Sequence, residues 1–207
     1  NKTLTANGTV AVSGTTGNTR TVTISGITGD GTLGISIGSG TASDIAGNLA
    51  AASGASATFT VDNTVPVVSA GVNQTKGVSF TQTGTAADAS GMTYSWSMQT
   101  GPGVVTFGSS SAVSTTISAS SDGTYVIRFS VTDAAGNSSY SDMTLVWDTT
   151  IPTVNIGSPS ATITKAGPVT YTVTYAGADT IALSDANIVL NKTLTANGTV
   201  AVSGTTG

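Results

Sequence analysis

The sequence contains no cysteine, no histidine and no glutamate, so all ten of its acidic residues are aspartates. Without cysteine no disulfide can brace the fold, and each domain depends on its own hydrophobic core. General acid–base catalysis usually uses histidine or glutamate, and zinc sites usually need histidine or cysteine. The composition therefore argues against an enzyme, and we expect no catalytic residue in this chain.

Charge is also scarce, because charged residues make up only 8% of the chain. The chain has six basic and ten acidic residues, and its net charge is −4. A negative net charge argues against a nucleic-acid partner or an anionic membrane surface. No run approaches the roughly 18 apolar residues of a membrane span, so we expect no membrane insertion. We expect an internal segment of a longer protein whose targeting signal lies outside it.

The strongest positive feature is an exact repeat. Residues 1–17 read NKTLTANGTVAVSGTTG, and residues 191–207 read the same seventeen letters. The chain thus looks like one period of 190 residues followed by the first 17 residues of the next period. Self-similarity at a fixed period is typical of arrays whose units act in series. It favours a stalk, a fibre or a multivalent surface protein.

Hydrophobic residues make up 38% of the chain, and many of them alternate with polar ones. Alternation in β-branched and aromatic runs, interrupted by Gly, Asp, Asn and Ser, predicts antiparallel strands. No stretch shows the apolar periodicity of a helix. The predicted fold is all-β, built of Ig-like sandwiches. The alternating runs are Val22 and Ile24; Leu33, Ile35 and Ile37; Tyr94, Trp96 and Met98; Tyr125, Ile127, Phe129 and Val131; and Val169, Tyr171, Val173 and Tyr175.

A weaker internal repeat predicts the domain boundaries. An Asp-x-Ala-Gly-Asn turn occurs at 44–48 and again at 133–137. After each turn comes an expected strand, and then a junction motif, Asp-(Asn/Thr)-Thr-(Val/Ile)-Pro. The prolines that end these junctions, Pro66 and Pro152, suit the first residue of an edge strand, where a missing N–H costs little. We predict tandem Ig-like sandwiches, one complete and one split between the chain ends. Residues 66–148 form the complete domain, 1–63 the C-terminal part of a second domain, and 152–207 the N-terminal part of the next one.

The junction and turn motifs carry a family resemblance. VTDAAGN at 131–137 and VDNTVP at 61–66 resemble the bacterial Ig-like tandem repeats of large surface proteins and adhesins. YSW at 94–96 and GTYVIRFSVTD at 123–133 are similar to polycystic-kidney-disease-type (PKD-like) repeats. The resemblance implies an extracellular stalk on a bacterial cell surface. It also implies that Ca²⁺ is sometimes bound at the junctions between domains.

Two interpretations of the turn and junction residues remain open. Asp and Asn in tight turns often cap their own backbone, which is a purely structural role. Alternatively, their oxygens could bind Ca²⁺, a hard cation that takes six to eight oxygen ligands. No other cofactor is expected. The candidate metal ligands are Asp62, Asn63, Asp148, Asp133, Asn137, Asp44 and Asn48.

Three aromatic residues are predicted to be structural. Trp96 and Trp147 alternate in phase with apolar neighbours, which indicates core positions rather than platforms for stacking sugars. Tyr125, three residues after Asp122, resembles the tyrosine corner of Ig-like folds.

The function that these features favour is a non-catalytic stalk segment of a repetitive bacterial adhesin or fibre. We expect neighbouring repeats or further copies, arranged head to tail, as its partners, and any host ligand at a tip outside this segment. Head-to-tail neighbours would also complete the split domain. One alternative is a module that binds glycans or proteins through many copies. Another is a spacer attached to a secreted hydrolase.

Overall fold

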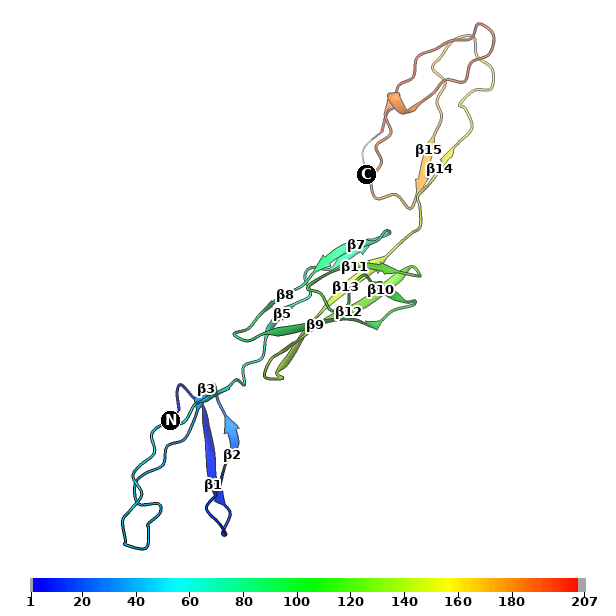
Figure 1. Ribbon diagram of the computed structural model, residues 1–207. Coiled ribbons are helices and arrows are strands. Elements are labelled where there is room, and N and C mark those ends of the chain that lie inside the picture. The colour runs from blue at the N-terminus through cyan, green and yellow to red at the C-terminus, as the bar shows by residue number, and fades with distance from the viewer. Residues whose placement is uncertain (1, 205–207) are drawn as a thin grey trace. The chain divides into compact units, whose positions relative to one another are not determined.

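The computed structural model describes residues 2–204, and nearly all of its regular structure is β-strand (Figure 1). Within these residues there is no α-helix, and the helical structure is a single 3-10 turn, η1 (Asp185–Asn187). The chain divides into two compact units, Asn1–Asp148 and Thr149–Gly207. The predicted all-β class is confirmed.

We call residues 66–148 the middle domain. Its first sheet contains four strands in the order β6-β13-β12-β9. They are β6 (Gln74–Lys76), β13 (Ser138–Trp147), β12 (Gly123–Asp133) and β9 (Met92–Thr100). β12 pairs antiparallel with both of its neighbours, whereas β6 runs parallel to the end of β13. The first strand of this sheet therefore lies beside the last strand of the domain.

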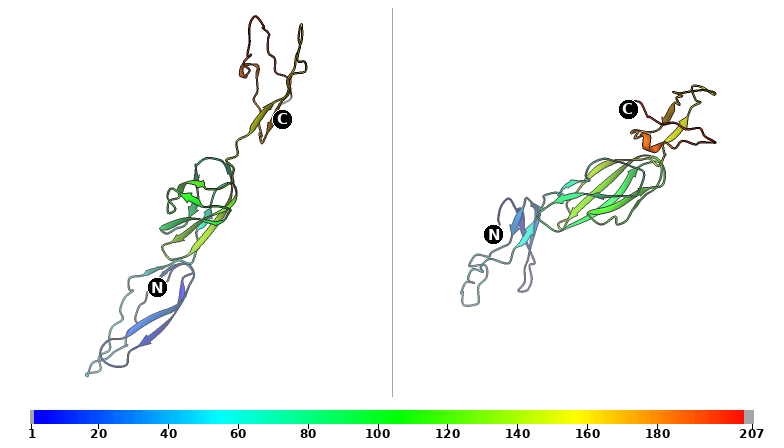
Figure 2. Two further views of the ribbon diagram at one scale, coloured as in Figure 1. Left: turned by 90° about the vertical axis from the view of Figure 1, so that its right-hand side faces the viewer. Right: turned by 90° about the horizontal axis from the view of Figure 1, so that it is seen from above.

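The facing layer is made of shorter antiparallel pieces. β7 (Phe80–Thr83), β11 (Ser114–Ala119) and β10 (Val105–Phe107) form one sheet, in the order β10-β11-β7. β5 (Val67–Ser69) pairs with β8 (Thr85–Ala87) in another. Figure 2 shows the middle domain from two further directions. The two layers form the β-sandwich that the alternating pattern predicts.

The core of this sandwich follows the alternation of β12. Tyr125, Ile127, Phe129 and Val131 all lie on the inner face and are completely buried. Side chains from the facing strands complete the cluster, among them Ile117 on β11. The prediction of a buried strand at 125–131 is confirmed because every second residue is apolar and turned inward.

The aromatic residues are structural, as predicted. The ring of Trp96 lies against Phe129 with 4.5 Å between centroids, and its Nε1–H donates to the carbonyl of Ala112 at 3.0 Å. Trp147 is also buried. The Tyr125 hydroxyl donates to the carbonyl of Ser121 at 2.6 Å, which is the tyrosine corner that the sequence predicts.

The N-terminal part of the first unit has a much smaller core. β1 (Asn7–Ser13) pairs with β2 (Thr21–Thr28), and β3 (Gly31–Leu33) pairs with β4 (Phe59–Val61). Its cluster of buried residues comprises only Ala6, Leu33 and Val61. The predicted strand that contains Leu33, Ile35 and Ile37 ends after Leu33. Beyond that point Ile37 makes only an isolated bridge with Ser53, because no continuous partner strand runs beside it.

The second unit contains β14 (Thr153–Ile156) and β15 (Val173–Ala176), which pair antiparallel. The prediction of a strand over 169–175 is wrong for residues 169–172, since β14 offers only four pairing positions and these lie opposite 173–176. Pro66 and Pro152 directly precede β5 and β14, as predicted for residues that open a strand.

Candidate metal-binding site

The two Asp-x-Ala-Gly-Asn turns adopt the same hydrogen-bond pattern. Asp133 Oδ1 accepts the backbone N–H of Asn137 at 2.8 Å, and Asp133 Oδ2 accepts Nδ2 of the same residue at 2.8 Å. Asp44 accepts the backbone N–H of Asn48 at 2.9 Å and its Nδ2 at 2.8 Å. Gly136 and Gly47 have φ of 95° and 87°, a region that favours glycine. The capping role predicted for these side chains is therefore present in both turns.

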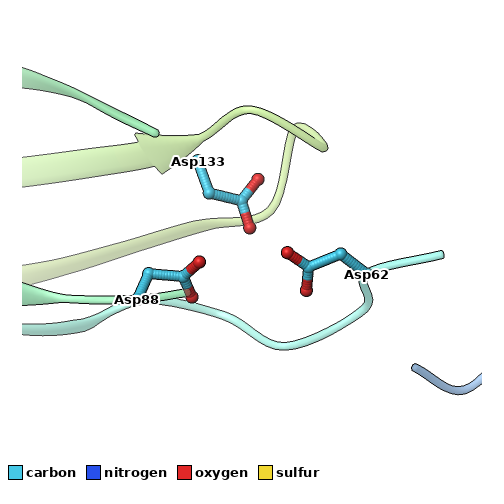
Figure 3. A group of neighbouring side chains, drawn as sticks. All are labelled: Asp62, Asp88 and Asp133. Carbon is cyan, nitrogen blue, oxygen red and sulfur yellow. The ribbon is translucent and has the colours of Figure 1, made fainter. Parts of the chain in front are cut away.

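Only one of the two turns belongs to an acidic cluster. Asp133 is the last residue of β12, Asp62 follows β4, and Asp88 follows β8. One carboxylate oxygen from each of the three lies within 4.8 Å of the others. Figure 3 shows the three carboxylates turned toward one another. Three aspartates that stand at or just after the ends of strands far apart in the sequence thus lie together at one end of the sandwich.

The hydrogen-bond donors around this cluster are neutral. Asp62 Oδ1 accepts the backbone N–H of Thr64 at 3.1 Å. Asp88 Oδ1 accepts both the N–H and the hydroxyl of Ser90, at 2.9 and 2.8 Å. Among the described residues the ion pair is Arg128–Asp142, and it includes none of the three clustered aspartates. The repulsion between the three carboxylates is therefore not offset by a paired basic side chain.

Asp133 nevertheless favours its charged form. Burial opposes ionisation, but hydrogen bonds from the side chain and backbone of Asn137, and from the N–H groups of Gly136 and Ala135, outweigh it. The pKa of Asp133 consequently lies below the ordinary value of an aspartate. The pKa of Asp44 is also lowered, chiefly by the side-chain hydrogen bond from Asn48. Two similar turns thus hold ionised carboxylates, one almost fully buried and the other exposed.

The chemistry of the cluster matches a hard divalent cation. Ca²⁺ prefers carboxylate, carbonyl and water oxygens, and three carboxylates could supply part of its shell, with water filling the rest. Asn137 contributes hydrogen-bond donors here, because its Nδ2 donates to the Asp62 carbonyl at 3.0 Å as well as to Asp133. Its contribution is to position both aspartates.

The other predicted ligands lie elsewhere. Asn63 donates its backbone N–H to Asp30 Oδ1 at 2.7 Å and its Nδ2 to the carbonyl of Gly29 at 2.6 Å. Asp44 and Asn48 stay within their own turn. Asp148 follows β13, whose end pairs with the start of β12, so it lies at the opposite end of the sheet from Asp133. The structure brings together Asp62 and Asp133, with Asn137 beside them.

Asp88 is the member of the cluster that sequence reasoning missed. It stands in the short stretch Ala-Asp-Ala-Ser at 87–90, which resembles any polar turn. Its place beside Asp133 depends on the pairing of β8 with β5 and on the packing of the two layers. No local signal marks that arrangement.

One family model matches the chain. Residues 69–146 match the family described as K319L-like, PKD domain. The matched range covers the middle domain, in agreement with the PKD-like resemblance. Comparisons with curated proteins and with solved structures found no match.

The match supports a general conclusion about this domain. A PKD-like domain is an Ig-like β-sandwich module, often used in adhesion or structural roles and typically extracellular and non-catalytic. Within residues 2–204 we found no helix with the length and apolar character that a membrane span requires.

Proposed function

We propose that this chain is a non-catalytic segment of the stalk of a repetitive bacterial cell-surface adhesin or fibre. The observation that carries the proposal is the exact recurrence of residues 1–17 at 191–207 on either side of a PKD-like sandwich. Asp62 and Asp148, which flank that sandwich, lie near opposite ends of β12. A domain that the chain enters at one end and leaves at the other adds its length to an array.

The pairing of β6 with β13 suits a segment that carries tension. The two strands are parallel, with Gln74 opposite Leu145 and Lys76 opposite Trp147. The backbone N–H of Asp148 extends this ladder by donating to the carbonyl of Lys76 at 3.0 Å. Hydrogen bonds in a parallel pair are evenly spaced and run from strand to strand at a slant. Tension that reaches β6 from one chain end and the end of β13 from the other would therefore shear these bonds together rather than open them one at a time.

The length of an array tests this proposal. β12 has 11 residues, so one sandwich is about 36 Å long at ~3.3 Å per residue. Chains that contain one, two and four periods should grow linearly in maximum dimension, by roughly 70 Å per period if both of its sandwiches stack lengthwise. Small-angle X-ray scattering measures that dimension. Growth as the cube root of the mass would contradict a stalk.

A glycan array screened with the same chains separates the stalk from a multivalent binding module. Both tryptophans are buried, and the exposed ring of Tyr140 is covered by the Arg128 guanidinium 3.5 Å from its centroid. We therefore expect no glycan to bind the middle domain, either in the single period or in the array. Binding that strengthens with the number of periods would favour the alternative function.

Within this function we propose that Ca²⁺ binds at Asp62, Asp88 and Asp133. Asp62 belongs to the segment that leads into the sandwich, whereas Asp88 and Asp133 belong to the sandwich itself. A cation shared by these carboxylates would hold the entering chain against the domain and limit bending at that point. The proposal is supported by the convergence of three carboxylates without a paired basic side chain among the described residues.

Thermal unfolding in excess Ca²⁺ and in excess chelator tests the metal. A ligand bound only by the native state stabilises it by about 2.7 kcal/mol at 100 times its Kd. Both tryptophans lie in the middle domain, so their fluorescence reports on its unfolding alone. We expect Ca²⁺ to raise the Tm of the unaltered chain and of Asp44→Asn, the matched control, but not of Asp88→Asn. Identical curves in Ca²⁺ and chelator would exclude the site.

A further inference from the structure

The part of the chain after the middle domain has strands but no core. None of its described residues, 149–204, is buried. In the β14–β15 pair, Val154 lies opposite Tyr175 and Ile156 opposite Val173. These four residues share one face of the pair, because directly opposite residues point to the same side of a sheet. Val154 and Ile156 remain 59% and 66% exposed, so this apolar face has nothing packed on it that buries it.

The N-terminal part carries a second apolar face of the same kind. Val10 lies opposite Ile24 and Val12 opposite Val22 in the β1–β2 pair. The residues between them, such as Thr9, Ala11, Thr21 and Thr23, are polar or small. Val10 and Val12 are 62% and 66% exposed. The β1 side of this apolar face is therefore left uncovered, whereas Val22 and Ile24 on β2 are half-buried.

Two adjoining grooves lie along this face. Both are lined by Ile24 and Gly34. Val10 and Leu33 line the first groove, and Val22, Ile35 and Phe59 line the second. An apolar groove beside a small three-residue core is the expected surface of half a sandwich whose second layer is absent.

The exact repeat indicates what fills that place. We call residues 2–13 the first repeat segment and residues 192–203 the second repeat segment. Both contain the same turn: Leu4 and Leu194 have φ of 54° and 56°, and Ala6 and Ala196 each donate to the carbonyl three residues before, at 3.3 Å. The turn is thus a property of the sequence alone.

Only the first repeat segment has strand partners. It pairs with β2, and the N–H groups of Thr3 and Thr5 donate to the carbonyls of Thr32 and Asp30, both at 3.0 Å. The described residues of the second repeat segment form no strand. They have the sequence and the turn needed for pairing with a β2–β3 edge, but not the pairing itself.

We propose that residues 152–203 of one chain dock on the N-terminal part of a second copy of this chain. The second repeat segment displaces the first from its position beside β2, and the apolar face of β14–β15 covers the grooves. Because the two segments are identical, the register is fixed: Val200 lies opposite Ile24 of the other copy and Val202 opposite Val22. This docking does not depend on the stalk proposal.

The contact is heterologous, because different surfaces of the two copies meet. Each copy that donates its C-terminal part still has an N-terminal part of its own that can accept the next copy. Such contacts do not close after two copies and can propagate head to tail. Strand addition to a sheet provides the backbone hydrogen bonds, and the alternate side chains supply the specificity.

Disulfide trapping of full-length chains tests the register, and the chain has no cysteine of its own to interfere. Val202→Cys in one chain is mixed under oxidising conditions with Val22→Cys in another. We expect a cross-linked dimer in which mass spectrometry identifies the peptides around 202 and 22 joined together. Val202→Cys mixed with Thr23→Cys is the matched control, because residue 23 points to the other face and should cross-link far less.

Two results would overturn the proposal. One is equal cross-linking of Val202→Cys to positions 22 and 23, which would indicate random encounter. The other is a monomeric disulfide in a chain that carries both Val22→Cys and Val202→Cys, since that chain would close on itself. The unaltered chain should also show a sedimentation coefficient that rises with concentration. A constant monomer value up to high concentration would contradict the docking.

Discussion

At the scale of single residues, the two Asp-x-Ala-Gly-Asn turns show how context changes one motif. Asp133 is only 6% exposed, and its partner Asn137 also bonds to the Asp62 carbonyl, so this turn joins two segments. Asp44 and Asn48 are exposed and bond mainly to each other. The same five-residue pattern therefore links two segments of the chain at 133–137 and forms an exposed turn at 44–48.

Asp133 should make the middle domain sensitive to acid. Its pKa is lowered in the folded state, so its contribution to stability is present above the ordinary pKa of 3.8 and is lost as the pH falls through the lower folded value. Tryptophan fluorescence during chemical unfolding at pH 7, 4 and 3 should show a falling free energy of unfolding. Asp133→Asn should be less stable at pH 7 and lose less on acidification, whereas Asp44→Asn should behave like the unaltered chain.

The tyrosine corner gives a second residue-scale prediction. Tyr125→Phe removes the hydroxyl that donates to the carbonyl of Ser121 and keeps the buried ring. The loss should be about 1 kcal/mol, the typical net worth of one hydrogen bond. Chemical unfolding followed by tryptophan fluorescence measures it. Tyr140→Phe, at a ring that is 58% exposed, should change little, and an equal effect of both variants would argue against a specific role for the Tyr125 hydroxyl.

At the scale of the strands, close packing between layers decides which substitutions the sandwich accepts. The ring of Phe129, on β12, lies close to Gly84, the residue between β7 and β8. A Cβ atom added at Gly84 would stand 2.6 Å from its ring. At that distance either the ring or the β7–β8 backbone must move, and a fully buried ring has little room.

Gly84→Ala should accordingly destabilise the middle domain by about 1–3 kcal/mol, the usual cost of overpacking a core. Gly91→Ala is the matched control, since a Cβ at that position meets nothing within 4 Å. Thermal unfolding of both variants gives the comparison. A Gly84→Ala chain as stable as the Gly91→Ala chain would mean that the layers are less tightly packed than the structure has them.

At the scale of the whole molecule, the repeat allows a comparison between chains of identical composition. Residues 1–190 and 18–207 contain the same amino acids, because 1–17 and 191–207 are identical. The chain 18–207 has lost the strand that pairs with β2 and retains the second repeat segment. It should self-associate more strongly than 1–190, since only a strand from elsewhere can fill the empty edge.

Sedimentation velocity of the two chains at matched concentrations measures this difference. Their equal mass and charge remove both properties as explanations. The same association constant for the two chains would indicate that the terminal seventeen residues do not decide the contact.

Much of the fold could be predicted from the sequence where the pattern is local or strongly periodic. The alternation of β12 predicted its buried face, and the Asp, Gly and Asn positions predicted both turns. Strand lengths were less predictable: the runs around Leu33 and Val169 are apolar enough to extend further, but their partner strands are short. A strand ends where its partner ends, and the partner is chosen by tertiary packing.

The candidate site was predictable only in part. Asp62 and Asp133 stand in repeated motifs, but Asp88 does not, and Asp148 stands in the same junction motif as Asp62 at the opposite end of the domain. Only the pairing of β5 with β8 and the packing of the layers bring Asp88 to the other two. Convergence of residues that are distant along the chain leaves no mark in a single sequence.

The duplicated segment separates what the sequence alone determined from what the tertiary structure decided. Both copies form the same turn, with a positive φ at Leu4 and at Leu194, because a turn is closed by hydrogen bonds within a few residues. Only the copy beside β2 is a strand, because a strand must have its N–H and C=O groups paired by another segment. Identical residues thus share a turn but differ in secondary structure, because only one of the two segments has a neighbouring strand to pair with.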